Sequence, residues 1–180
     1  QLDGSITDCF DGKADLKRGI IRCVGDPERR FREDALRMLR AWRFSAQLGF
    51  SIEEHTARAI RDNAELCRLL SRERVCAEAE KTLLSPRPET LSVMLREGLL
   101  AACGIEGDYE LHALKTVSAE ADARWAMLKV LIPKLDMQQF RLPSRRVQLA
   151  ETAAAAYRPS YARQELKTLL AASGEEVARV

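Results

Sequence analysis

One segment of the sequence, residues 30–44, carries side chains that could act as a hydrogen-bonding template. Asp34 and Arg37 are three residues apart, and on a helix this spacing makes them neighbours on one face. A carboxylate only accepts hydrogen bonds, whereas a guanidinium only donates them, through a planar fork. Held side by side, the pair matches the Watson–Crick edge of cytosine or adenine, where an exocyclic amine lies next to a ring-nitrogen acceptor. Uracil and guanine reverse both contacts, so we expect them to be rejected.

The bland alternative for this pair is an ordinary ion pair on an exposed helix, worth about 0.2–0.5 kcal/mol. Arg40 and Arg43 continue the row at steps of three, but each step drifts by about 60° around a helix of 3.6 residues per turn. The row therefore winds around the axis. Arg40, and after it Arg43, could offset the charge of a triphosphate. Spacing alone leaves both interpretations open.

A single helix is predicted to position these side chains. Asp26 followed by Pro27 is a typical helix start, and Gly49 is a typical stop after Leu48. Apolar residues at steps of three and four give this helix one buried face: Phe31, Ala35, Leu39, Trp42 and Ala46. The only convincing strand is residues 20–24, which is β-branched and ends at Gly25. We expect its pairing partners to lie outside this chain.

The remaining sequence is also predicted to be helical. Ser51 to Glu54 form a capping box for a helix with the stripe Ala57, Ile60, Ala64 and Cys67, and Ser71 can cap the next. Further helical patterns cover residues 71–84, 89–100, 108–117, 119–132, 134–140, 144–157 and 161–172. Of the 180 residues, 25 are Ala and 24 are Leu, whereas Gly and Pro number only 9 and 6. We therefore predict an all-α fold, an elongated multi-helix array with at most one short strand near the N-terminus.

Composition also narrows the function classes. No apolar stretch approaches the roughly 18 residues that a membrane span needs, so no membrane partner is expected. Five cysteines with no C-x-x-C pair argue against a disulfide framework and favour a cytoplasmic location. The two histidines are too few and too far apart for a zinc site, so no metal ligands are expected.

Positive charge is concentrated in residues 13–46. This segment has ten Lys and Arg residues against five Asp and Glu, whereas residues 47–180 balance at 19 of each. A local basic surface favours a polyanion such as RNA or a nucleoside triphosphate. A solvated helix face is the alternative that charge alone leaves open.

Three runs of residues closely resemble the class II tRNA nucleotidyltransferase and bacterial poly(A) polymerase family, which includes the CCA-adding enzymes. They are Asp8-x-Phe10-x-Gly12-x-x-Asp15-Leu16, Ile21-Arg22-x-Val24-Gly25-Asp26-Pro27 and Arg30-Phe31-x-Glu33-Asp34-x-Leu36-Arg37-x-Leu39-Arg40-Ala41-x-Arg43-Phe44. The match is dense over residues 8–60 and weaker at 71–81, 124–128 and 142–144.

The resemblance implies a division of the chain and a role for each part. Residues 1–25 would be the end of a catalytic head, 26–103 a helical neck that selects the nucleotide, and 104–180 a body and the start of a tail that bind tRNA. The neck motif of the family is a protein template for CTP and ATP. It falls here on Glu33, Asp34 and Arg37, and Arg40 and Arg43 would contact the bound nucleotide.

The family's Gly-Ser segment and its Asp-x-Asp pair, which binds catalytic magnesium, do not occur in this sequence. No catalytic residue is therefore assigned, Mg²⁺ is expected only in a complete enzyme, and the chain alone is expected to be inactive. The acidic pairs Asp108 with Glu110 and Glu120 with Asp122 read as solvated helix residues. Arg141, Arg145 and Arg146 are candidates for RNA backbone contact, although an exposed helix start explains them as well.

Several activities remain open within and beyond this resemblance. The complete protein is expected to add all or part of CCA to tRNA 3′ ends, and a CC-adding or A-adding specialist would carry the same neck. A bacterial poly(A) polymerase shares the motif. A non-catalytic helical RNA-binding module is the alternative from another class. The sequence does not indicate an oligomeric state.

Overall fold

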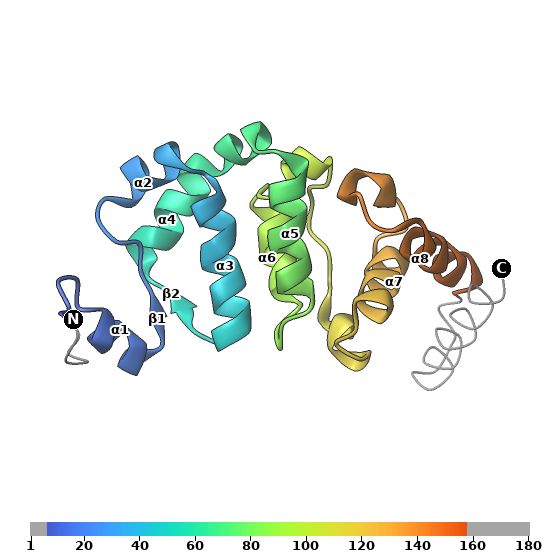
Figure 1. Cartoon of the computed structure of the whole chain (residues 1–180), viewed down its shortest axis with the longest axis horizontal. Helices are drawn as coiled ribbons and strands as arrows, with labels where there is room; N and C mark the ends of the chain where they lie inside the picture. Colours follow the sequence, from blue (N-terminus) through green and yellow to red (C-terminus); the bar gives the residue numbers. More distant parts are fainter. Residues whose placement is uncertain (1–6, 158–180) are drawn as a thin grey trace.

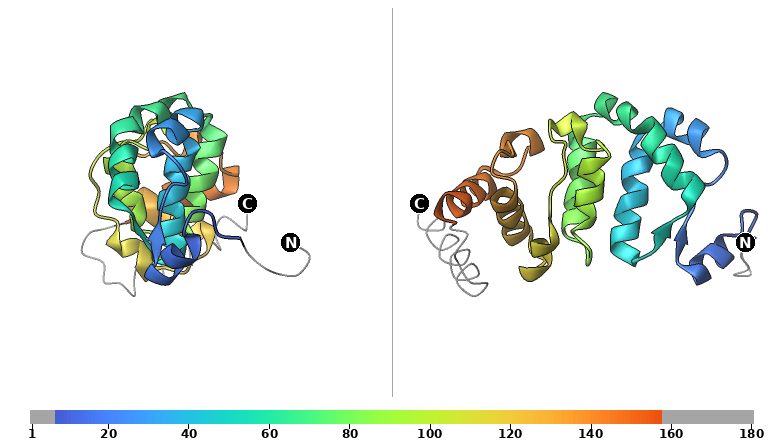
Figure 2. Two further views of the ribbon diagram at one scale, coloured as in Figure 1. Left: turned by 90° about the vertical axis from the view of Figure 1, so that its left-hand side faces the viewer. Right: turned by 180° about the vertical axis from the view of Figure 1, so that it is seen from behind.

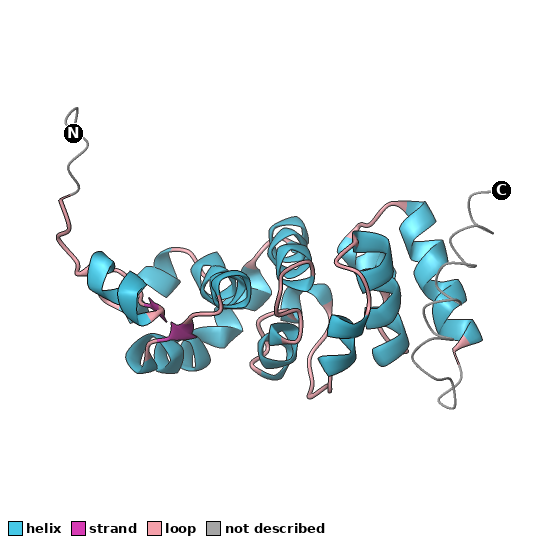
Figure 3. Ribbon diagram, turned by 90° about the horizontal axis from the view of Figure 1, so that it is seen from below, coloured by secondary structure: helices cyan, strands magenta, loops and turns pink. Residues whose placement is uncertain are grey.

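The computed structural model describes residues 7–157, which form an elongated, curved row of helices. The elements follow one another in space much as they do in sequence, with α1 to α4 at one end, α5 and α6 in the middle and α7 and α8 at the other end (Figure 1). The views from behind and from below show the same extended row (Figures 2 and 3). The predicted all-α class is confirmed. The helices are α1 Gly12–Arg18, α2 Pro27–Glu33, α3 Leu36–Leu48, α4 Glu54–Asn63, α5 Arg72–Leu83, α6 Thr90–Arg96, α7 Ala121–Leu131 and α8 Ser144–Ala156, with 3₁₀ turns η1 Ala64–Leu69, η2 Ala101–Cys103, η3 His112–Thr116 and η4 Met137–Phe140.

A parallel pair of two-residue strands, β1 Ile20–Ile21 and β2 Ser51–Ile52, joins two segments at the N-terminal end. Ile20 pairs with Ser51 and Ile21 with Ile52. The predicted strand is thus shorter than residues 20–24, and the expectation that its partner lies outside this chain was wrong. The pairing holds the segment after β1 against the start of α4, where the Cys23 amide donates to the Thr56 hydroxyl at 3.1 Å.

The single helix predicted over residues 26–48 is two helices, because the chain breaks at Asp34. Asp34 has extended backbone angles (φ −155°, ψ 102°). Its carboxylate oxygen Oδ1 accepts from the Leu36 amide at 3.1 Å, and its carbonyl accepts from the Arg37 amide at 3.1 Å. Aspartate favours such capping positions because its side chain competes for backbone amides that a helix start leaves unpaired. Asp34 therefore lies at the junction between α2 and α3 instead of within one longer helix.

Other helix boundaries also differ from the sequence prediction. Glu53, and not Ser51, caps α4, since its side chain accepts from the Thr56 amide at 2.8 Å. The helix predicted over 89–100 is the shorter α6, and the patterns at 108–117 and 134–140 form only the 3₁₀ turns η3 and η4. The helix predicted over 161–172 lies outside the described residues.

A continuous apolar core runs along the row, and α5 lies at its centre. One side of α5 packs on α3 and the other contacts α7. Apolar residues of all three helices belong to one buried cluster, including Leu39, Val75 and Trp125. Trp125 also donates from Nε1 to the Glu80 carboxylate of α5 at 3.1 Å. Helix α5, which packs on α3, is therefore held in place by α7 on its other side.

No helix within residues 7–157 is long and apolar enough to cross a membrane.

Candidate nucleotide site

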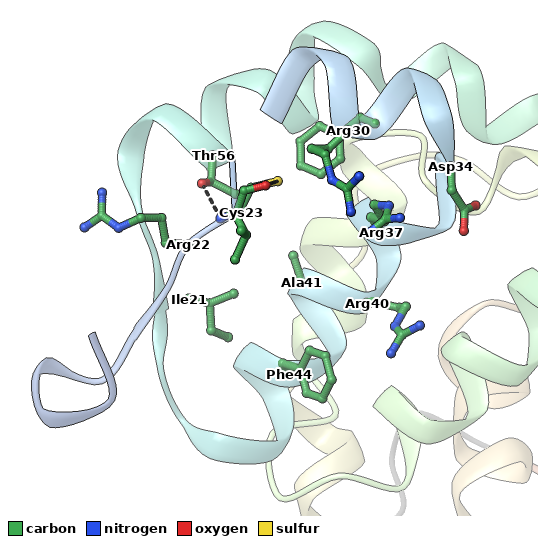
Figure 4. A pocket seen from close by; sticks show the side chains of 12 residues that line it. Ile21, Arg22, Cys23, Arg30, Asp34, Arg37, Arg40, Ala41, Phe44 and Thr56 are labelled. Carbon is green, nitrogen blue, oxygen red and sulfur yellow. Dashed lines mark hydrogen bonds between the residues drawn. The ribbon is translucent and has the colours of Figure 1, made fainter. Parts of the chain in front are cut away.

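A cavity of about 340 Å³ opens where the end of β1, helix α2, helix α3 and the start of α4 meet (Figure 4). Its size lies within the range of small-molecule sites. Four arginines and one aspartate line it together with apolar side chains: Arg22, Arg30, Arg37, Arg40, Asp34, Ile21, Cys23, Val24, Phe31, Ala41, Phe44 and Thr56. Three of the residues predicted from the template motif, Asp34, Arg37 and Arg40, thus lie around one cavity.

Positive charge dominates the lining, and two of its arginines have no acidic partner. Arg22 pairs with Asp15 at 2.8 Å, and Arg30 pairs with Glu33 at 2.5 Å. No carboxylate among residues 7–157 forms an ion pair with Arg37 or Arg40. Two uncompensated guanidinium groups beside an apolar wall create a local potential that attracts an anionic ligand.

Asp34 and Arg37 lie on the same cavity but not on one turn of one helix. Asp34 precedes α3, whereas Arg37 is the second residue of α3. No side-chain hydrogen bond joins the two within the described structure, so both retain hydrogen-bonding capacity for a ligand. The Nε donor of Arg37 is buried without any partner. A buried donor left unpaired is costly, which is consistent with a group that a ligand or an ordered water satisfies.

Glu33 and Arg43, which the sequence also assigned to the nucleotide, do not line the cavity. Glu33 pairs with Arg29 and Arg30 along α2. Arg43 points toward α5, where its Nε contacts the Glu78 carboxylate at 2.5 Å. Its Nη1 donates to the side chain of Gln47, on α3 itself, at 2.7 Å. The drift of a three-residue step around the helix explains this placement, since it carries Arg43 past the face that holds Arg40.

Two contacts beside the cavity were not predicted from the sequence. Phe44 lines the cavity, and its ring lies under the Arg43 guanidinium, 3.9 Å from carbon to centroid. Arg74 reaches across from α5, and its Nη2 donates to both oxygens of Asp34 at 3.1 and 3.0 Å. Arg74 follows Asp34 by 40 positions, so only the packing of α5 on α3 reveals the contact.

The three arginines proposed from sequence to contact RNA differ in their surroundings. Arg141, which has a left-handed backbone (φ 49°), pairs with Glu73 at 2.9 Å. Arg146 is largely buried between Asp122 at 2.7 Å and Glu80 at 2.8 Å, so it joins α8 to α7 and α5. Arg145 is exposed and has no partner in the part of the chain that the structure describes. Arg145 is therefore the one with a guanidinium available to a polyanion.

Within residues 7–157, no three or more His, Cys, Asp or Glu side chains are grouped so that they could hold a metal ion. Of the distal acidic residues, Asp108 faces Arg96 at 3.8 Å and Asp122 is bound by Arg146. The described residues do not fit the divalent metal site that the resemblance implies, so no step of chemistry is assigned to a metal here.

The chain is similar in sequence to known CCA-adding enzymes. Residues 49–103 match the family model described as the probable RNA and SrmB-binding site of polymerase A. The CCA-adding enzyme of Limosilactobacillus fermentum is 41% identical over 145 residues, which cover 77% of this chain and 36% of that enzyme. The CCA-adding enzyme of Leuconostoc mesenteroides is 52% identical over 99 residues, which cover 54% of this chain and 25% of that enzyme.

Solved structures show the same arrangement of helices. The CCA-adding enzyme of Bacillus stearothermophilus in complex with CTP superposes with a TM-score of 0.79 at 30% identity, over 99% of this chain and 54% of that one. A Thermotoga maritima CCA-adding enzyme complexed with tRNA shares the fold, with a TM-score of 0.60 at 19% identity over 96% of this chain and 52% of that one. The chain spans only about a quarter to a third of the length of the curated relatives cited above.

Proposed function

Because the chain belongs to the family of tRNA nucleotidyltransferases and bacterial poly(A) polymerases, we propose that it is the nucleotide-selecting and RNA-binding part of an enzyme that adds CCA, or part of it, to tRNA 3′ ends. The observation that carries this proposal is the shared cavity of Asp34, Arg37 and Arg40. In it, one acceptor, one donor fork and uncompensated positive charge surround a space of nucleotide-site size.

The base would be read by the two groups at the start of α3. The Asp34 carboxylate would accept from the exocyclic amine of cytosine or adenine, and the Arg37 guanidinium would donate to the adjacent ring nitrogen. Apolar side chains of Ile21, Ala41 and Phe44 offer a surface for the face of the base. One bidentate contact of this kind discriminates by roughly 1–3 kcal/mol against a base with the reversed pattern.

The triphosphate would lie against the unpaired positive charge. Arg40 is exposed at the cavity and carries no ion pair, so it is the residue we assign to the phosphates. Direct nucleotide contact by Glu33 and Arg43 stays a prediction from the family motif. Their contacts favour supporting roles, since Glu33 forms an ion pair with Arg30 and Arg43 stacks on the Phe44 ring.

The rest of the chain would hold the RNA. We propose that residues 26–103 act as the neck and residues 104–180 as the body and the start of the tail, with Arg145 contacting phosphate or sugar of tRNA. We propose that the complete enzyme uses Mg²⁺, and none of the residues that the structure describes is assigned to hold it. All five cysteines are free thiols, which fits the reducing cytoplasm that we propose as the compartment.

The experiment supplies full-length protein with tRNA that lacks its 3′ end, gives CTP, ATP, UTP or GTP singly, and sequences the products. We expect addition of C and A only. Asp34→Ala and Arg37→Ala should reduce selectivity against UTP and GTP about 5- to 100-fold, as the loss of a bidentate contact predicts. Asp34→Asn keeps the acceptor that caps α3 but turns a donor toward the amine, so it should lose selectivity while keeping its fold.

Exposed residues outside the cavity provide matched controls. Arg58 and Asp62, both exposed on α4, pair only with each other within the described structure, at 3.8 Å. Alanine at either position should leave selectivity unchanged. Unchanged selectivity in both template variants would contradict the assignment of the cavity.

A poly(A) polymerase is the second candidate, favoured by the family model that matches residues 49–103. That enzyme would add A but not C to the same substrate and would extend RNAs other than tRNA. A non-catalytic RNA-binding module would bind tRNA without adding any nucleotide.

A further inference from the structure

Two cysteines that the nucleotide cavity does not use lie in contact inside the row of helices. Cys76, in α5, and Cys103, in η2, are 27 residues apart in sequence, and their sulfur atoms lie 3.6 Å from each other. Both residues are buried, at 8% and 2% exposure, and both are free thiols. An S–S bond is about 2.05 Å long, so the two sulfur atoms need to approach by only about 1.5 Å, within reach of side-chain rotation and small backbone shifts.

Neighbouring contacts keep these two thiols facing each other. Arg72, at the start of α5, donates from Nε to the carbonyl of Ala102, the residue before Cys103, at 3.2 Å. The sulfur of Cys76 also lies 3.7 Å from the Gln139 carbonyl oxygen in η4. Segments α5, η2 and η4 therefore enclose the pair.

We propose that Cys76 and Cys103 are a modification site, at which a hydroperoxide such as hydrogen peroxide converts the two thiols into a reversible disulfide that ties η2 to α5. In the first step the Cys76 sulfur attacks one peroxide oxygen, the O–O bond breaks, and the other oxygen leaves as water with the thiol proton. In the second step the Cys103 sulfur attacks the resulting sulfenic acid, the S–S bond forms, and the sulfenic oxygen leaves as water with the Cys103 proton. The two thiols lose two electrons to the peroxide, and two waters are released for each hydrogen peroxide.

Cys76 is assigned as the sulfur that reacts first. It is the more exposed of the two, and the thiolate is the reactive form of a cysteine. The hydrogen bond between the two thiols lowers the pKa of Cys76, against the effect of burial, and the same contact raises the pKa of Cys103. Cys103 is then already in contact with the sulfenic acid that it resolves.

Two other fates of these thiols give different products. Cysteines that pack only as small apolar groups would stay reduced, as we expect of Cys67, which is fully buried and forms no hydrogen bond with either thiol within residues 7–157. A reactive thiol without a resolving partner would pass from sulfenic to sulfinic acid, which dithiothreitol does not reverse. A disulfide between the two residues distinguishes the proposal from both.

The test treats folded full-length protein with hydrogen peroxide, blocks the remaining thiols with iodoacetamide and digests with trypsin without reduction. Cys76 and Cys103 fall in separate tryptic peptides, residues 75–81 and 97–115, and each peptide holds one cysteine. We expect mass spectrometry to find these two peptides joined, with a mass two hydrogen atoms below their sum. Dithiothreitol should separate them again. This measurement needs no variant, so it does not depend on the folding of one.

Single substitutions test the order of the two steps. Cys103→Ala should leave a Cys76 sulfenic acid that dimedone labels, whereas Cys76→Ala should leave Cys103 reduced. Cys67→Ala is the matched control, because it removes a buried cysteine outside the pair and should leave the linked peptides unchanged.

Hydrogen exchange tests whether the bond ties η2 to α5. The Cys103 amide donates to the Leu100 carbonyl at 2.9 Å. Because the disulfide restricts the opened state of the segment between the two cysteines, this amide should exchange at least about fivefold more slowly in the oxidised protein than in the reduced one. Equal exchange in both forms would overturn the proposed tie.

Three results of the peptide mapping would overturn the modification site. They are a pair that stays reduced while peroxide oxidises the exposed Cys9, a disulfide from Cys103 to Cys67, and a sulfinic acid as the main product at Cys76. None of these results bears on the nucleotide cavity, so the proposed function stands or falls separately.

Discussion

The buried ion pair between Arg43 and Glu78 offers the sharpest test of how α3 is held. The two side chains are 10% and 8% exposed, and Arg43 Nε lies 2.5 Å from a Glu78 oxygen. Glu78→Ala would leave a guanidinium in the interface between α3 and α5 without its counter-charge. Arg43 would retain the Gln47 side chain at 2.7 Å and the face of Phe44.

The expected cost follows from this burial. Removing one partner of a buried pair typically costs about 3–5 kcal/mol, because it strands the other charge. The contacts that remain to Arg43 place the expected loss at the lower end, about 3 kcal/mol in the free energy of unfolding. With a urea dependence of about 2 kcal/mol per molar, the unfolding midpoint should fall by about 1.5 M. Arg43→Met combined with Glu78→Leu removes both charges and should recover most of the loss.

The assay is urea unfolding of this chain followed by circular dichroism at 222 nm. Glu73→Ala on the same helix is the matched control, since it breaks the exposed pair with Arg141 at 2.9 Å and should cost at most about 1 kcal/mol. A midpoint shift in Glu78→Ala no larger than that of Glu73→Ala would refute the reasoning. So would a double variant as unstable as the single one.

Three further results are expected. Burial raises the pKa of Glu97, and the hydrogen bond from Trp42 opposes this shift. The protonated Glu97 side chain therefore favours folding, and this stabilisation is lost as the pH rises from the ordinary carboxyl pKa through the raised one. Urea unfolding should show Glu97→Gln gaining stability over wild type as the pH rises from 4 to 7. Burial raises the pKa of Cys67 to about 12, so native-state iodoacetamide at pH 8 should alkylate the exposed Cys9 and spare Cys67, as read by mass spectrometry. Tripolyphosphate should raise the melting temperature by several degrees, and Arg40→Ala should reduce this protection; equal protection of both proteins would count against the anion site.

Apolar spacing and helix-start residues were sufficient to predict two of the helices. The helices predicted over 71–84 and 144–157 are found as α5 and α8, because their apolar spacing and starts are written within a few residues. The break at Asp34 was missed because the apolar stripe continues through it: Phe31, Ala35 and Leu39 are all buried, although they belong to two helices and their junction. A stripe records which residues face the core and does not record where the backbone leaves the helix.

The candidate site divides in the same way. Asp34, Arg37 and Arg40 were predicted from their spacing together with the resemblance to the family, and they lie around one cavity. Asp34 and Arg43 each pair with a residue of α5 that is distant in sequence. Arg74 pairs with Asp34 across 40 residues, and Glu78 pairs with Arg43 across 35. Nothing in a single sequence specifies such pairs, so the sequence alone could not show that Arg43 faces α5 and not the cavity.

The arginines around the cavity differ in whether they have an acidic partner, and this difference leaves net positive charge on α3. Around it, Arg22, Arg30 and Arg43 each have a carboxylate within 2.8 Å, so their positive charge is offset within the protein. Arg37 and Arg40, one turn apart on α3, have none among the described residues. Like charges three residues apart on a helix destabilise it slightly. An acidic partner for Arg37 or Arg40, such as the other arginines have, would remove this repulsion. A bound anion removes it as well, and it does so only while the ligand is present. The folding free energy that α3 forgoes in the free protein is thus available as binding energy for a phosphate-bearing ligand.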